Sequence, residues 1–509
     1  MKKILSLLSN RLFTVAVLII LQLVFMMTVL YRLGEIDRNV NFVLLVLSYI
    51  MVVYVINKQG NPSFKLAWCI LILILPIFGG IFYLLFGDKK VPKALQKNML
   101  ASIQESLPLI NQENEILELV EGLNYGAYKQ FKYVWKNTYF PVYRNTSVEY
   151  FKVGEEKFET MIVELKKAKH FIFIEYFIIE EGVFWNTILD ILVQKVKEGV
   201  LVRVMYDDAG CVSTLPAKYK KTLEEKGIEC AVFNPLKARL VVQMNNRDHR
   251  KICVIDNQVG FVGGINLADE YINKVVRFGY WKDTAVMLKG EAVWSLTVMF
   301  LQFWGYVKKQ KKINYLDFKL ETNIQNSEGY VQPFSDSPTD HEEAGLNVHM
   351  NLINNAKKYI YIETPYLVIG YEMQKALTLA AKSGVDVRIM TPHVPDKWYV
   401  HLVSQANYLP LIREGVKIYE YSPGFVHSKT MVSDDIMGIC GTINMDYRSY
   451  YLHYECGVLM YNTKALLDMK KDYLQTLEDC MEITIEDCKN EILIKRIIRS
   501  VLNFFAPLM

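Results

Sequence analysis

A long internal duplication constrains the fold of this 509-residue chain more than any other feature. The pattern His-x-Lys-x-x-x-x-Asp runs from His249 to Asp256 and again from His427 to Asp434, and a Gly-x-Ile-Asn turn follows each copy. The flanking segments repeat too: FIFIE and GVLVR precede the first copy, and YIYIE and GVDVR return about 180 residues later. Because solenoid repeats have periods of about 20 to 50 residues, this spacing indicates two copies of a domain-sized unit.

Each unit reads as alternating strands and helices. The β-branched and aromatic run at 170–179 predicts a buried strand, the apolar spacing at 185–197 a helix, and the run at 200–206 another strand. Behind the first motif, 252–255 and 260–262 predict a hairpin. The fold class is therefore α/β, with two halves that we expect to pack as pseudo-twofold partners around one composite site.

These patterns divide the chain into five segments. The polar stretch from Thr322 to Glu343 is expected to connect the two halves. Ile492 to Phe505 places Lys495, Arg496 and Arg499 among apolar residues, which fits either an interfacial helix or an ordinary docking helix. The predicted segments are a membrane part at 1–90, juxtamembrane helices at 91–139, a first half at 140–320, a second half at 321–480 and an amphipathic C-terminus at 481–509.

The N-terminal part is strongly apolar. Uncharged runs cover Phe13 to Tyr31, Phe42 to Ile56 and Leu66 to Gly87, and a helix needs about 20 apolar residues to cross a bilayer. The first run is too long for a signal peptide and lacks a cleavage site, so we expect a retained anchor. We therefore predict two or three transmembrane helices and a multi-pass protein of the cell membrane. Basic residues on both flanks favour a catalytic part on the cytoplasmic side.

Charge and cysteine content exclude other classes. The formal net charge of +4 is spread along the chain, which argues against a nucleic-acid partner. The eight cysteines form no Cys-x-x-Cys and no zinc spacing, so we expect reduced thiols and no metal. Oligomeric state is not readable from the sequence.

The two motifs supply the groups that phosphodiester chemistry needs. A phosphodiester is anionic, so Lys251 and Lys429 can neutralise its oxygens, and the turn amides Asn266 and Asn444 can donate hydrogen bonds to them. One histidine can attack phosphorus while the other donates a proton to the leaving alkoxide. We expect His249 and His427 to share these two roles.

Each catalytic histidine also needs a carboxylate on its second ring nitrogen. From the strands that follow the two Asn turns, we expect Asp283 to contact His249 and Glu455 to contact His427. Asp256 and Asp434 complete the motifs and are candidates for the site, although their place in hairpin turns favours a structural role. His393 and His453 have no repeat partner and are interpreted as structural, whereas Tyr447 and Arg448 lie close enough along the chain to touch a headgroup.

The paired motifs resemble the phospholipase D superfamily. The segments at 245–251, 263–271 and 441–449, the apolar stretch ending at Gly87 and the C-terminal FAPLM resemble its bacterial cardiolipin synthase branch in particular. The resemblance implies a duplicated phospholipase D-like fold. It also implies a reaction in which two phosphatidylglycerols give cardiolipin and glycerol without metal or nucleotide. It further implies that His249 is the nucleophile and His427 the acid, although the similarity of the halves allows the reverse.

Three alternatives fit the same residues or part of them. A phospholipase D hydrolase would use water as acceptor and release phosphatidic acid, and a phosphatidylserine synthase would need a nucleotide-activated lipid. A catalytically silent membrane scaffold is a third possibility, but two complete His/Lys/Asn sets argue against it. The expected partners are phosphatidylglycerol, other anionic lipids and the membrane itself.

Overall fold

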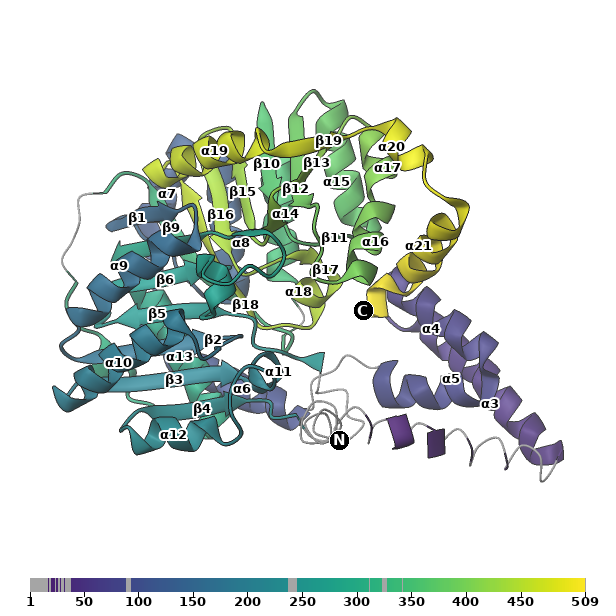
Figure 1. Ribbon diagram of the computed structural model, residues 1–509, viewed down its shortest axis with the longest axis horizontal. Coiled ribbons are helices and arrows are strands. Elements are labelled where there is room, and N and C mark those ends of the chain that lie inside the picture. Colours follow the sequence, from purple (N-terminus) through teal and green to yellow (C-terminus); the bar gives the residue numbers. More distant parts are fainter. Residues whose placement is uncertain are drawn as a thin grey trace.

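In the computed structural model the chain forms two mixed α/β halves, each built on one sheet (Figure 1). The structure describes residues 38–87, 93–236, 245–310, 312–322, 327–340 and 342–508, together with a few positions between 17 and 32. In order across the sheet, the strands of the first half are β1 (Thr146–Phe151), β8 (Ala285–Gly290), β6 (Val259–Gly263), β5 (Lys251–Ile255), β2 (Phe171–Tyr176), β3 (Leu201–Asp207) and β4 (Glu229–Phe233).

The second sheet repeats this order and adds one strand at its edge. Its central strands are parallel and its motif hairpin is antiparallel, as in the first sheet. The duplication predicted from the sequence is thus confirmed by the topology. In order, the strands are β9 (Tyr330–Asp336), β18 (Glu455–Tyr461), β16 (Met437–Gly441), β15 (Thr430–Ser433), β10 (Tyr359–Glu363), β12 (Asp386–Pro392), β13 (Lys417–Tyr421) and β19 (Cys480–Ile483).

The strand and helix predictions around the first motif are confirmed, whereas the predicted connection is wrong. Thr322 to Glu343 contains β9, which pairs with β18 as the counterpart of β1 beside β8. Polar residues of β9 misled the prediction, because Gln332 is buried and donates to the carbonyls of Phe131 and Phe140. A hydrogen-bonded polar residue can therefore sit in a buried strand.

Helices surround both sheets (Figure 1). Those of the first half are α9 (Gly154–Lys166), α10 (Val183–Lys197), α11 (Asp208–Cys211), α12 (Tyr219–Glu225) and α13 (Val293–Lys308). Those of the second half are α14 (Ala344–Asn355), α15 (Tyr371–Lys382), α16 (Trp398–Ala406), α17 (Tyr408–Ile412), α18 (Tyr447–Tyr451), α19 (Lys464–Leu477), α20 (Ile485–Lys489) and α21 (Leu493–Phe505).

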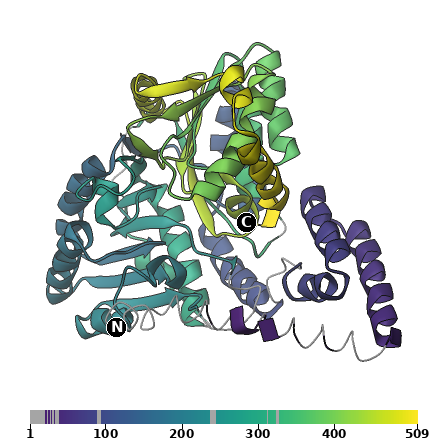
Figure 2. The same ribbon diagram turned by 45° about the vertical axis from the view of Figure 1, so that its right-hand side comes forward.

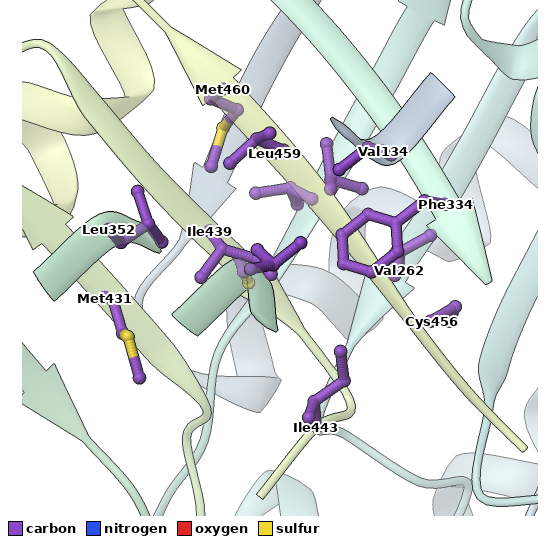
Figure 3. Packing of buried hydrophobic residues seen from close by; sticks show 14 of the residues in the cluster. Val134, Val262, Phe334, Leu352, Met431, Ile439, Ile443, Cys456, Leu459 and Met460 are labelled. Carbon is purple, nitrogen blue, oxygen red and sulfur yellow. The ribbon is translucent and has the colours of Figure 1, made fainter. Parts of the chain in front are cut away.

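The two halves share one hydrophobic core. Helix α13 is mostly apolar and is buried from Val293 to Gly305, as expected for a helix enclosed by protein. Figure 3 shows Val262 of β6 beside Phe334 of β9 and Cys456 of β18, so side chains of the first sheet pack directly against the second. A continuous core of this kind holds the halves, and hence the two motifs, in a fixed relation.

The third apolar run of the N-terminal segment forms shorter helices than predicted. Leu66 to Gly87 is not one helix: α4 (Pro62–Ile74) ends at Leu75, and Pro76 begins α5 (Pro76–Phe82), which a π-helical turn follows at Tyr83–Gly87. Proline has no N–H to continue the helix and clashes with the preceding turn. In the part of the chain that the structure describes, no helix combines the length and apolarity needed to cross a bilayer, and most of Phe13 to Tyr31 lies outside that part.

The described N-terminal helices contact the second half. Helices α3 (Arg38–Asn57), α4 and α5 pack on one another through Val55, Trp68 and Ile72, and they stand to one side of the two halves (Figure 2). Phe64 of α4 contacts Tyr447 and Tyr451 of α18. The remaining helices, α6 (Lys93–Ser106), α7 (Asn114–Leu123) and α8 (Tyr125–Thr138), connect this segment to the first sheet.

Candidate active site

The two histidines of the motifs line one cavity of about 680 Å³ between the halves. His249 lies two residues before the start of β5, and His427 lies between β14 (Gly424–Val426) and β15. The equivalent strands β5 and β15, one from each half, therefore begin beside the same cavity. The structure confirms that the two motifs form one composite pocket.

The carboxylate partners are crossed between the halves, contrary to the prediction. Glu455 Oε1 and Oε2 both lie 3.0 Å from Nδ1 of His249, and Asp283 Oδ2 lies 2.6 Å from Nδ1 of His427. Each histidine therefore receives its carboxylate from the other half. The sequence supplied the right two carboxylates but could not supply their pairing, which depends on how the halves dock.

Backbone hydrogen bonds across the junction explain the crossing. The His249 N–H donates to the carbonyl of Tyr454 at 2.9 Å, and the His427 N–H donates to the carbonyl of Lys282 at 2.7 Å. These are equivalent contacts, because Tyr454 and Lys282 directly precede the two carboxylates. Strands β14 and β7 (Tyr280–Lys282) also pair across the junction. Each motif is thus hydrogen-bonded to the segment of the other half that carries its carboxylate partner.

Burial sets the charge state of the histidines. Burial and the two nearby lysines lower the pKa of His249 and of His427 well below the usual value. Burial raises the pKa of Asp283 to about 6. A neutral imidazole whose Nδ1–H donates to a carboxylate leaves a lone pair on Nε2, the form required of a nucleophile or base.

The lysines lie beside their own histidines. Lys251 Nζ donates to the His249 carbonyl at 2.6 Å, and Lys429 Nζ donates to the His427 carbonyl. Burial is the main cause that lowers the pKa of Lys251 to about 8 and that of Lys429 to about 7. A bound phosphate would favour the charged form of both, so the pair is suited to an anionic ligand.

Both turn asparagines line the cavity. Asn266 Oδ1 accepts from the backbone N–H of Ile178 at 3.0 Å, while its Nδ2 donates to the Tyr271 hydroxyl at 2.7 Å. Asn444 is also buried. The structure therefore brings His249, Asn266 and their second-half counterparts to one cavity, and the two lysines lie behind them, hydrogen-bonded to the carbonyls of the histidines.

The two motif aspartates lie at the other end of their strands. Asp256 follows β5 at φ 51° and accepts hydrogen bonds from the N–H groups of Lys169, His170 and Phe171. Asp434 follows β15 at φ 55° and holds the N–H groups of residues 357, 358 and 359 in the same way. Neither lines the cavity. Their inclusion among candidate site residues is corrected: they fix the turn that starts each central strand.

His453 is a site residue that the sequence interpretation missed. It was interpreted as structural because it has no repeat partner, yet it lines the cavity and its ring lies 5.6 Å from that of His249. The overlooked signal is its place two residues before Glu455, since alternate residues of a strand share a face. His393, interpreted in the same way, contacts Glu420 at 2.8 Å and does not line the cavity.

One group in the site has the spacing of metal ligands. Among the described residues, ligand atoms of His249, His453 and Glu455 lie within 4.8 Å of one another. The same Glu455 atoms already orient His249 and accept from the Thr442 hydroxyl at 2.6 Å. These atoms have the spacing to bind a cation, but the Glu455 carboxylate is already in contact with Nδ1 of His249.

Comparisons with known proteins agree with this geometry. The family described as "Cardiolipin synthase, PLD-like domain" matches residues 161–288 and 350–477, and "Phospholipase_D-nuclease N-terminal" matches residues 46–87. Cardiolipin synthases of Alkalihalophilus pseudofirmus and Halalkalibacterium halodurans are 34% and 33% identical to this chain. The alignments cover 92% and 98% of this chain and 93% and 100% of those proteins.

Two further relatives extend the comparison. An uncharacterized protein of Streptococcus mutans is 45% identical over 90% of this chain and 99% of its own length. Among solved structures, phosphatidylserine synthase of Haemophilus influenzae superposes with a TM-score of 0.57 at 16% identity. That alignment covers 74% of this chain and 98% of the other, and at such low identity it supports the fold alone.

Proposed function

The chain belongs to the cardiolipin synthase family with phospholipase D-like domains, and we propose that it transfers a phosphatidyl group between two phosphatidylglycerols, giving cardiolipin and glycerol. The observation that carries this proposal is the pair of histidines on one cavity, each oriented by a buried carboxylate. Two such histidines suit a two-step transfer better than a single hydrolytic attack by water.

In the first step, one histidine attacks the phosphorus of the donor lipid through Nε2. The second histidine takes up a proton on Nε2 when the anionic donor lipid binds, because a nearby negative charge favours the charged ring. As the P–N bond forms, the bond from phosphorus to the glycerol oxygen breaks, and this histidine gives its Nε2 proton to that oxygen. Lys251, Lys429, Asn266 and Asn444 hold the non-bridging oxygens as charge builds on them. Following the family resemblance, we assign the attack to His249 and the proton transfer to His427.

The second step reverses the first with a different alcohol. A hydroxyl of a second phosphatidylglycerol gives its proton to the histidine that acted as acid and attacks phosphorus as the P–N bond breaks. The nucleophilic histidine leaves as a neutral imidazole, which its carboxylate restores to the starting tautomer. Protons and charges therefore balance over the cycle without a cofactor.

Delivery of a diacyl lipid favours a site held at the membrane. The apolar runs at the N-terminus and the matched N-terminal family segment at residues 46–87 support membrane attachment. Because phosphatidylglycerol stays in the bilayer, attachment raises its concentration at the cavity. We propose a protein of the cell membrane whose catalytic part lies on the cytoplasmic side.

The test uses the full chain in vesicles that contain phosphatidylglycerol labelled in its headgroup phosphorus. Cardiolipin and free glycerol in equal amounts, together with a covalent label on the protein, are expected. The label should disappear in His249→Ala, while the control His393→Ala should retain it. Phosphatidic acid as the product would favour the hydrolase, and full turnover by His249→Ala or His427→Ala would exclude the two-histidine mechanism.

A further inference from the structure

Helix α21 exposes the face that a helix docked on a protein core would bury. With a period of about 3.6 residues, its apolar residues fall on one side and its basic residues on the other. The apolar side chains that are 42–67% exposed are Leu493, Ile494, Ile497, Ile498 and Val501. A docking helix would turn such a face inward, so the exposure favours an interfacial helix.

Contacts on another side of α21 hold the helix in this orientation. Lys495 and Arg499 pair with Glu491, which lies before the helix, at 2.9 Å and 2.5 Å. Leu502 is partly buried against the hydrophobic cluster that includes Val403 of α16, and α21 packs along that helix. These contacts keep the apolar face of α21 turned outward.

The end of α21 takes part in the lining of the active-site cavity. Ala506, which directly follows the helix, is buried and lines the cavity. Helix α16, on which α21 packs, contributes Tyr399, Val400 and Val403 to the same lining. Through Leu502 and Ala506, apolar side chains therefore continue from α21 to the cavity.

The same end of α21 meets the N-terminal helices. Ala506 belongs to the hydrophobic cluster on which Phe64 of α4 packs. Helix α4 exposes apolar residues of its own, Leu66, Leu73 and Ile74, within the segment that supports membrane attachment. Figure 1 shows α21 and helices α3 to α5 on the same side of the molecule. A bilayer that holds the N-terminal segment is therefore close to the exposed face of α21.

We propose that the apolar face of α21 lies in the surface of an anionic bilayer and brings the cavity to the lipids. This inference rests on the proposed function, which takes both substrates from the membrane, and adds a second membrane contact to that of the N-terminal segment. An apolar face opposite a basic one suits the boundary between acyl chains and headgroups. Anionic headgroups complement the exposed Arg496 and the Lys495–Arg499 pair, of which Glu491 neutralises one charge. A stable protein partner would need about 20–30 residues on each side, far more than one helix face offers.

Photochemical labelling locates the contact. The full chain is reconstituted in vesicles of phosphatidylglycerol and phosphatidylcholine, and the phosphatidylcholine carries a photoactivatable group near the headgroup end of one acyl chain. After irradiation, lipid adducts mapped by mass spectrometry should fall on Ile494, Ile497 or Val501. The control within the same chain is Leu467 of α19, which is 52% exposed and does not line the cavity. It should carry no adduct.

Activity separates lipid contact from a structural role. The double variant Ile494→Asp, Ile497→Asp changes only exposed positions, so its fold should be retained. Its rate of cardiolipin formation on vesicles should fall about tenfold or more, because interfacial binding scales with the apolar area that is inserted. Its rate on short-chain phosphatidylglycerol dispersed as monomers should equal that of wild type. Leu467→Asp should leave both rates unchanged.

Contrary results would point to other roles for this face. Wild-type protein without adducts on α21, or an equal loss of both rates in the double variant, would overturn the lipid contact. A wild-type dimer in detergent that dissociates in the double variant would also overturn it, because the face would then bind a second copy of the chain. Wild-type protein that makes no cardiolipin from either substrate would overturn the proposed function, while the adducts would still decide whether α21 contacts lipid.

Discussion

Replacing Glu455 with Gln removes one buried negative charge from the contact with His249 and changes little else in size. Glu455 is 0% exposed and also accepts from the Thr442 hydroxyl. The Gln amide oxygen can still accept from the neutral His249 ring. What the variant loses is stabilisation of a positively charged ring, and His249 becomes positive whether it bonds to phosphorus or carries the proton.

The size of the effect follows from the geometry. With Nδ1 and the carboxylate oxygens 3.0 Å apart, the centres of the two charges are about 4 Å apart, which gives about 4 kcal/mol at an effective dielectric constant of about 20. The neutral hydrogen bond that Gln retains offsets about 1 kcal/mol. The remaining 3 kcal/mol or so corresponds to a rate loss on the order of a hundredfold.

The assay is the initial rate of cardiolipin formation in mixed micelles at saturating phosphatidylglycerol, normalised to folded protein. The matched control is Glu420→Gln, which changes another buried Glu that contacts a histidine Nδ1, that of His393, outside the cavity. Its rate should stay near wild type. A rate for Glu455→Gln within a few-fold of wild type would refute the electrostatic argument. In spectra of 15N-histidine-labelled enzyme, larger shifts for His427 than for His249 would refute the crossed pairing.

Three other expectations follow from the site. Because burial raises the pKa of Asp283 to about 6, its carboxylate is lost as pH falls through that value, so kcat/KM should rise with pH up to about 6 and this limb should vanish in Asp283→Asn. At the alkaline side, kcat/KM should fall as Lys429 and Lys251 lose their protons near pH 7 and 8, and a flat profile would contradict this. Asp256→Ala should lower the free energy of unfolding by about 2–3 kcal/mol in urea titrations, because three backbone N–H groups, that of the buried Phe171 among them, lose a charged acceptor. The specific activity of the folded fraction should change little. Chelation by EDTA should leave the rate unchanged, and a loss restored by a divalent cation would indicate a metal at His249, His453 and Glu455.

Sequence patterns determined the parts of this protein that depend on local chemistry. Strand periodicity and two copies of one motif were enough to predict two similar α/β halves, one shared cavity and the histidines and asparagines that line it. The break at Pro76 was equally local, but the length of the apolar run concealed it. The burial of β9 could not be predicted from its own residues. Its polar Gln332 is buried because the side-chain amide donates hydrogen bonds to carbonyls of another segment.

Only the tertiary structure decided which carboxylate serves which histidine. His249 and Glu455 are 206 residues apart, and His427 and Asp283 are 144 residues apart, so their pairing depends on how the two halves dock. Two similar halves offer the same partners to each motif, and the sequence gives no reason to prefer one assignment. Hydrogen bonds across the junction, from His249 to Tyr454 and from His427 to Lys282, select the crossed one. The same docking places His453 and Arg448 on one side of the cavity and so breaks the symmetry that the repeated motifs display.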